Sequence, residues 1–218
     1  MKRLFLVAFA VAGALFGTAG AQAKGPPDGV DICGASGTCV HLSTQDAETN
    51  WPLWAPPSPY QTDRASAARP FLVVHWHWPN QPETSAYYVP ASGKVRQLDT
   101  NGFLAWYDLA DATSVRTKTA SLDPFPVPRV TRVTVGTRRV RDPESYLQLF
   151  GRGYEVFPAI LPGWQPIRFT ADTASPWTDA ATDVRIARRG SLLWIDGTIL
   201  KIPLQLAQRI RRGASLRG

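Results

Sequence analysis

The stretch Phe71–Pro79 is the longest unbroken apolar and aromatic run after the N-terminal segment, and it constrains the fold most. It is typical of a strand, whose successive side chains point to opposite faces. One face then suits a core, and the other is half apolar and half imidazole. The first face comprises Leu72, Val74, Trp76 and Trp78, and the second Phe71, Val73, His75 and His77.

Other short strands follow the same pattern. The turn Pro90–Gly93 predicts a hairpin between residues 87–89 and 94–96, and another strand is expected at 104–109 with Trp106 inward. Strands at 130–135, 183–188, 192–195 and 198–202 are expected, the last two joined by the strong hairpin signal Asp196-Gly197.

Two short helices are expected, one from Asp142 to Phe150 and one opened by Pro203 and ended before Gly213. No long helical periodicity is present. The sequence therefore predicts a mainly β fold, with antiparallel sheets arranged as a sandwich or an open barrel and one or two short helices.

Two proline-rich segments interrupt this pattern. Residues 44–69 are expected to form an irregular strap, and residues 123–128 alternate proline with other residues and must be extended. We expect one β-rich domain over residues 24–218. If the chain has a subdomain boundary, residues 123–129 are the best candidate, because the charge balance changes there.

The N-terminus has the three regions of a secretory signal peptide. Lys2 and Arg3 precede an apolar run, and the small residues that follow end at Ala23, the expected cleavage point. Residues 1–23 would be removed, and no transmembrane segment is expected in the mature chain. The expected destination is secreted or extracytoplasmic, in the cell envelope or outside it.

Positive charge is concentrated in the C-terminal half. Residues 24–128 carry seven Lys and Arg against ten Asp and Glu, whereas residues 129–218 carry fifteen against seven. An exported protein with this balance would meet anionic envelope polymers or a lipid surface, and nucleic acid is not expected as a partner. A solvated basic surface without a specific ligand is the alternative.

The chain has two cysteines, Cys33 and Cys39, separated by five small residues. An oxidising destination and an even count predict a disulfide between them. A metal site is the competing interpretation, because Cys39 and His41 share one strand face while His75 and His77 share another. No cofactor is expected on the disulfide interpretation.

Catalytic motifs such as G-x-S-x-G, H-E-x-x-H and S-x-x-K are absent from the sequence. A histidine-dependent mechanism would have to use His41, His75 or His77. Carboxylates offer a second route, since Asp172, Asp179 and Asp183 surround Trp177 and glycoside hydrolysis needs two carboxyl groups beside an aromatic platform. The aromatic candidates for ligand binding are Trp51, Trp54 and Trp177.

Three stretches, Asp31–Leu42, Tyr87–Leu98 and Leu192–Arg212, resemble uncharacterised secreted proteins of high-GC bacteria. The resemblance covers about half of the mature chain, implies secretion, and transfers no activity and no site residues. The leading hypothesis is a non-catalytic binding or scaffolding module. The alternatives are an envelope glycan hydrolase using Asp172, Asp179 or Asp183, and a metal-binding protein using His75 and His77.

Overall fold

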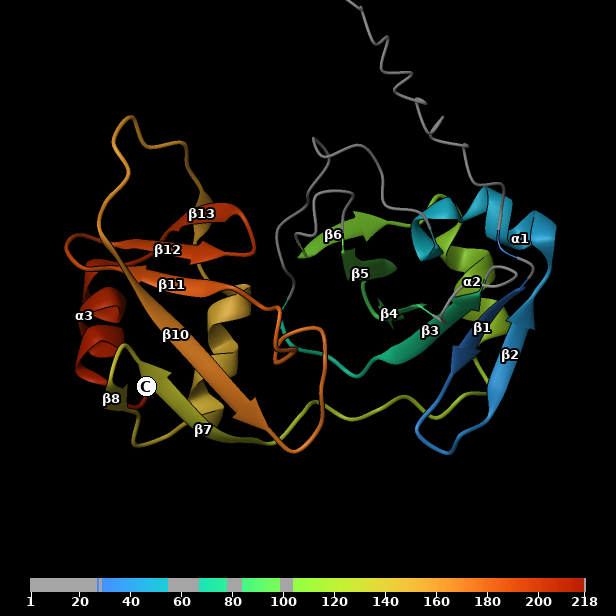
Figure 1. The fold of residues 1–218 in the computed structure, drawn as a ribbon, viewed down its shortest axis with the longest axis horizontal. Helices are drawn as coiled ribbons and strands as arrows, with labels where there is room; N and C mark the ends of the chain where they lie inside the picture. The colour runs from blue at the N-terminus through green and yellow to red at the C-terminus, as the bar shows by residue number, and fades with distance from the viewer. Residues whose placement is uncertain (1–26, 28, 55–66, 78–83, 99–103, 218) are drawn as a thin grey trace, which may run out of the picture.

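Two antiparallel sheets lie side by side in the molecule (Figure 1). The structure is a computed structural model and describes residues 27, 29–54, 67–77, 84–98 and 104–217. The expected signal peptide, residues 1–23, lies outside the described residues. The expected class, mainly β with antiparallel sheets, is confirmed, and over the described ranges neither sheet closes into a barrel.

The first sheet has six strands and carries three short helices. Its strands are β1 (Gly29–Cys33), β2 (Cys39–Leu42), β3 (Leu72–His77), β4 (Thr84–Val89), β5 (Lys94–Leu98) and β6 (Leu104–Asp108), in the order β2-β1-β3-β4-β5-β6. The helices are α1 (Thr44–Thr49), the 3-10 helix η1 (Trp51–Leu53) and α2 (Ala112–Lys118).

The second sheet has seven strands. They are β7 (Val130–Val135), β8 (Arg138–Arg139), β9 (Tyr154–Glu155), β10 (Trp164–Ala171), β11 (Val184–Ala187), β12 (Leu192–Ile195) and β13 (Thr198–Lys201), in the order β8-β7-β10-β11-β12-β13-β9. The 3-10 helix η2 (Glu144–Gly151) and α3 (Leu204–Arg212) belong to this part of the chain. The change from one sheet to the other falls between residues 109 and 129.

Strand β3 has the two faces that its sequence predicts. Leu72, Val74 and Trp76 are buried, whereas Val73 and His75 are partly exposed. The side chain of His77 lies outside the described part of the structure, as do residues 78 and 79. Alternation therefore identified the core face of this strand correctly.

The hairpin between β12 and β13 is confirmed at Asp196-Gly197. Ile195 pairs with Thr198 across a two-residue turn. Both turn residues have positive φ, 45° at Asp196 and 94° at Gly197, as a turn that follows the right-handed twist of a hairpin requires. An aspartate tolerates this left-handed backbone better than most residues do.

The expected helix after Pro203 is confirmed as α3. Gly213 follows it with φ 64°, the left-handed conformation that ends a helix. The expected helix at 142–150 exists as η2, a 3-10 helix rather than an α-helix. Its apolar side chains, including Tyr146, Leu149 and Phe150, are buried against the seven-stranded sheet.

The expectation that residues 44–69 are irregular is wrong for residues 44–53, which form α1 and η1. Ser43 accepts a hydrogen bond from the Asp46 backbone N–H, and the Asp46 side chain accepts one from the Ser43 N–H. This reciprocal capping box starts a six-residue helix despite the prolines that follow. Residues 55–66 lie outside the described residues.

Each sheet has its own apolar core, and the second core reaches into the first sheet. Phe71, Val89 and Trp106 pack with the residues of the seven-stranded sheet. The ring of Trp177 lies 5.7 Å from that of Trp106 and 6.3 Å from that of Phe71. Aromatic contact therefore joins the two sheets.

A buried ion pair crosses the same junction. The Arg96 Nη2 atom of β5 lies 2.5 Å from Asp196 Oδ2 in the β12–β13 turn, with side chains 0% and 4% exposed. Arg96 also donates to the Thr182 hydroxyl at 3.1 Å, and its guanidinium lies 5.9 Å from the Trp106 ring centre. Burial raises the pKa of Asp196, while Arg96 opposes that rise.

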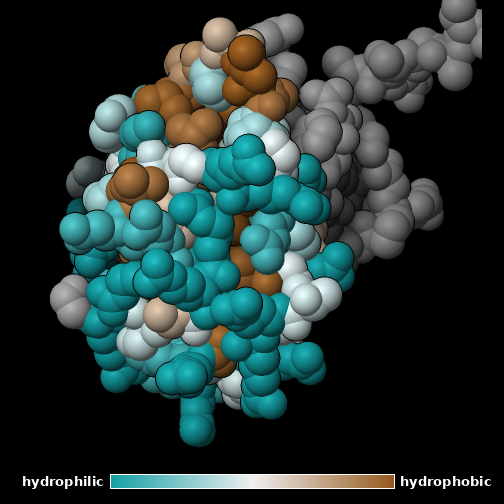
Figure 2. Space-filling view, turned by 90° about the vertical axis from the view of Figure 1, so that its left-hand side faces the viewer, coloured by the Kyte–Doolittle hydropathy of each residue, from teal (hydrophilic) through white to brown (hydrophobic). Residues whose placement is uncertain are grey.

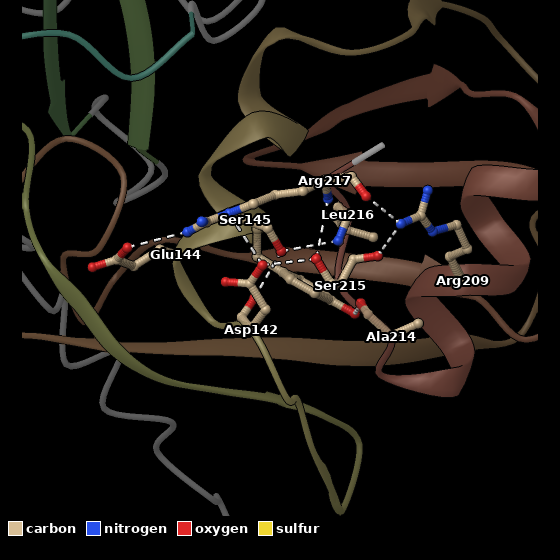
Figure 3. Close-up of polar contacts among 9 residues, drawn as sticks. Asp142, Glu144, Ser145, Arg209, Ala214, Ser215, Leu216 and Arg217 are labelled. Carbon is tan, nitrogen blue, oxygen red and sulfur yellow. Dashed lines mark hydrogen bonds and ion pairs between the residues drawn. The ribbon is translucent and has the colours of Figure 1, made fainter.

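A polar network fastens the C-terminal tail to η2 (Figure 3). Asp142 accepts a hydrogen bond from the Ser215 hydroxyl at 2.7 Å, and the Ser145 hydroxyl accepts one from the Leu216 N–H at 3.0 Å. Arg209 donates to the carbonyls of Ser215 and Arg217. These arginine contacts complete the end of α3 and are part of the fold.

The predicted disulfide between Cys33 and Cys39 is present. The two cysteines are paired across β1 and β2, and the hairpin loop between them contains Gly37 at φ 79°. The bond closes a local loop at the end of the six-stranded sheet.

Breaking the buried ion pair should unfold the protein more readily. We expect Arg96→Met and Asp196→Asn each to lower the free energy of unfolding by about 3–5 kcal/mol, because each leaves one buried charge without its partner. Asparagine also tolerates positive φ, so Asp196→Asn preserves the turn. Urea unfolding of both variants and of the double variant measures the coupling. Additive losses would contradict a direct pair.

Removal of the disulfide should have a smaller and local effect. We expect Cys33→Ala/Cys39→Ala to lose about 2 kcal/mol of stability in the chain-entropy model, since the closed loop is short. Thermal unfolding measures the loss, and thiol titration of the unfolded wild-type protein should detect no free thiol. Two titratable thiols per chain would contradict the bond.

Candidate functional site

One face of the seven-stranded sheet is covered by helices and the other is open. Ile167, Val184 and Leu193 point inward and belong to the core formed with η2 and α3. Figure 1 shows η2 behind β10 and α3 at the left edge of the sheet, so no helix lies in front of β10. Because side chains alternate, the intervening residues of the same strands lie on the open face.

Two rows of side chains cross this open face. In the first row Thr134 of β7 lies between Arg139 of β8 and Arg168 of β10. The second row places Arg185 of β11 beside Trp194 of β12. Strand register therefore gathers arginine and tryptophan from segments about 60 residues apart in the sequence.

The aromatic part of the face is ordered by contacts among its own members. Trp164 and Trp194 meet edge to face with ring centres 5.9 Å apart, and the Arg185 guanidinium lies 5.6 Å from the Trp194 ring centre. Arg185 is held from the other side by Asp183, through bonds of 2.8 and 2.7 Å to its two carboxylate oxygens. A planar cation stacked on an indole is a surface suited to sugar rings and anionic groups.

Several arginines of the basic half have partners within the fold, and others are exposed without one. Arg211 of α3 donates to the carbonyls of Ala187 and Gly190, and Arg138 of β8 donates to the carbonyl of Arg212. Arg217 of the tail pairs with Asp142 and Glu144. On the open face, the exposed side chains of Arg132, Arg139 and Arg168 have no hydrogen-bond or ion-pair partner among the residues that the structure describes. Lys201 of β13 is also exposed, and the register of β12 and β13 places it on the same face. These four cations are available to an external ligand.

A groove of about 620 Å³ runs beside this face, between β10, β11 and the segment before β11. Trp164 and Arg168 line it from β10, and Arg185 lines it from β11. Asp179 and Asp183 line it from the preceding segment. The groove is open to solvent and carries both charge signs, with Arg168 as its unpaired cation over the described ranges.

The three aspartates suggested for hydrolysis do not act as one group. Asp179 and Asp183 share the groove, but Asp172 lies outside it and accepts a hydrogen bond from the Arg129 N–H at 3.0 Å. Asp179 accepts from the Tyr87 hydroxyl at 2.9 Å and from the Ala181 N–H at 2.9 Å. Burial, and next the charge of Asp179, raise the pKa of Tyr87, so this hydroxyl remains a donor.

The three tryptophans suggested for binding have different surroundings. Trp177 is fully buried against Trp106 and Phe71, so its ring cannot meet a ligand from solvent. Trp54 is partly buried, and its indole N–H donates to the Ala47 carbonyl at 2.8 Å. Trp51 is 38% exposed. The tryptophans of the open face, Trp164 and Trp194, were not among the sequence candidates.

Of the histidine and cysteine candidates, Cys39, His41 and His75 share one face of the six-stranded sheet. Strand β1 lies between β2 and β3, so Asp31 is opposite both His41 and His75. His41 Nδ1 is 2.8 Å from Asp31 Oδ1, and His75 Nδ1 is 3.1 Å from the Ser85 hydroxyl. The disulfide occupies Cys39 and removes it as a thiolate ligand. Within the described ranges no group of three or more potential ligands converges on a metal-sized space.

Comparison with models of protein families, with curated proteins and with solved structures found no match for this chain. Among its described helices, none has the length and apolar character needed to cross a bilayer. The functional argument therefore rests on the chemistry of the open face.

Proposed function

We propose that this chain is an exported, non-catalytic binding module that holds an anionic polymer of the cell envelope. The observation that carries the proposal is the open face of the seven-stranded sheet, where Arg132, Arg139 and Arg168 are exposed on the same face as Trp164 and Trp194. The N-terminal signal sequence supports the extracytoplasmic location.

The geometry favours an extended ligand over a small enclosed one. The guanidinium groups come from three adjacent strands, β8, β7 and β10, and neighbouring strands of a sheet are about 4.8 Å apart. Such spacing distributes positive charge over a surface instead of focusing it in a cavity. A polymer with repeated phosphate, sulfate or carboxylate groups can contact several of these cations at once.

Binding is favoured over hydrolysis because the carboxylates in the groove already accept internal hydrogen bonds. Asp183 holds Arg185 with both oxygens, and Asp179 holds Tyr87 of the other sheet. Both contacts position parts of the fold. Glycan hydrolysis by Asp179 and Asp183 remains the second candidate, since they share one groove.

Removing the free cations should weaken polymer binding. We expect Arg132→Gln/Arg168→Gln to bind dextran sulfate about tenfold more weakly, because two charge-assisted contacts are lost. Neither side chain has a described internal partner, so the melting temperature should not change. Isothermal titration at two salt concentrations measures the effect.

Arg69→Gln is the matched control, because Arg69 is exposed, lies outside the seven-stranded sheet and has no described internal partner. An equal loss of affinity in the control, or wild-type binding that does not weaken with salt, would contradict the proposed face. Purified envelope glycans incubated with the wild-type protein test the hydrolase alternative. Release of reducing ends that Asp183→Asn abolishes would replace binding by hydrolysis.

A further inference from the structure

The segment between β9 and β10, residues 156–163, is an apolar loop on the surface. It reads Val-Phe-Pro-Ala-Ile-Leu-Pro-Gly and contains no polar side chain. Phe157 is 91% exposed, Ile160 84% and Leu161 62%. Large apolar residues gathered in this way on a surface mark an interaction site.

Figure 2 shows this concentration at the top of one face, where brown atoms gather above a largely hydrophilic surface. In Figure 1 the same loop projects above β12 and β13 at the upper left. Tyr154 in β9 and Leu204 at the start of α3 are also exposed, and both line a groove of about 880 Å³. The exposed apolar side chains of this part of the sheet are therefore concentrated in the loop.

Both ends of the loop are fixed to the sheet. The Val156 N–H donates to the Ile199 carbonyl at 2.9 Å, and the Arg188 N–H donates to the Gly163 carbonyl at 2.8 Å. Pro158 and Pro162 restrict φ within the loop. The apolar side chains are thus presented by a constrained backbone, which reduces the entropy lost when they are buried by a partner.

Three cations lie near the two ends of the loop. Lys201 is opposite Tyr154 in the β13–β9 ladder, and the Arg188 side chain lies against Gly163 and donates to the Trp164 carbonyl. Arg152 precedes β9, and Glu155 is the acidic residue in the same stretch. An apolar tip with cations near its base matches the order of a lipid surface, where acyl chains lie below anionic headgroups.

We propose that residues 156–163 insert into the interface of a lipid bilayer that contains anionic headgroups, and that Arg152, Arg188 and Lys201 contact those headgroups. This site adjoins the open face at Trp164 and uses other cations than Arg132, Arg139 and Arg168. A second copy of the chain is a less suitable partner for the loop. A symmetric contact would place the same three cations of the two copies close together, where they repel.

The test is sedimentation of the purified protein with vesicles. We expect binding to vesicles of equal parts phosphatidylglycerol and phosphatidylcholine, and at least about tenfold weaker partitioning of Phe157→Ser/Ile160→Ser, which loses most of the exposed apolar area. Arg188→Gln/Lys201→Gln should partition about tenfold more weakly onto these vesicles, and its partitioning onto phosphatidylcholine alone should change little. Val127→Ser, an exposed apolar residue away from the loop, should bind as the wild type does.

A probe attached at Ile160→Cys reports the insertion directly. The native cysteines form a disulfide, so the new thiol can be labelled selectively with an environment-sensitive fluorophore. Its emission should shift to the blue on anionic vesicles, and the same label at Val127→Cys should not shift. Loop variants that bind vesicles as tightly as the wild type would overturn the proposal. So would a lipid-free dimer, seen by analytical ultracentrifugation, that Phe157→Ser/Ile160→Ser abolishes.

Discussion

The association of the two sheets depends on a charge pair that neither sheet could keep alone. Arg96 is fully buried, and its charge would be strongly unfavourable there without the carboxylate of Asp196. The aromatic cluster of Phe71, Trp106 and Trp177 excludes water around this contact and so strengthens it. The open face and the apolar loop both lie on the sheet that this pair holds in place.

Local chemistry was enough to predict much of the fold. The Asp196-Gly197 turn and the Gly213 helix end each need positive φ at a defined position, and the sequence provides residues that accept it. Strand β10 was missed because Pro166 interrupts its pattern. The Pro166 carbonyl accepts a hydrogen bond from the Gly136 N–H, just after the end of β7. The backbone N–H that proline lacks would point to the same place, so no hydrogen bond between the two strands is lost.

The candidate sites were harder to predict, because strand order decides which residues meet. Alternation within β10 gives Arg168 an outward direction, but only the pairing with β7 and β8 places it in a row with Arg139. Trp177 and Asp179 showed the opposite difficulty. The sequence suggests that the polar, aspartate-rich loop around them is available for catalysis. In the structure Trp177 packs on Phe71 and Asp179 accepts from Tyr87, about 90 or more residues earlier, so the loop belongs to the junction between the two sheets.

The distance along the chain between the junction residues bears on how the protein folds. Arg96 and Asp196 are 100 residues apart, and Tyr87 and Asp179 are 92 apart. The six-stranded sheet is synthesised first, and Arg96 stays exposed to water until the β12–β13 hairpin that carries Asp196 has formed. Docking of the sheets is therefore a late step with a high loop-closure cost, and the first sheet exposes Phe71 and Trp106 to chaperones and proteases until then.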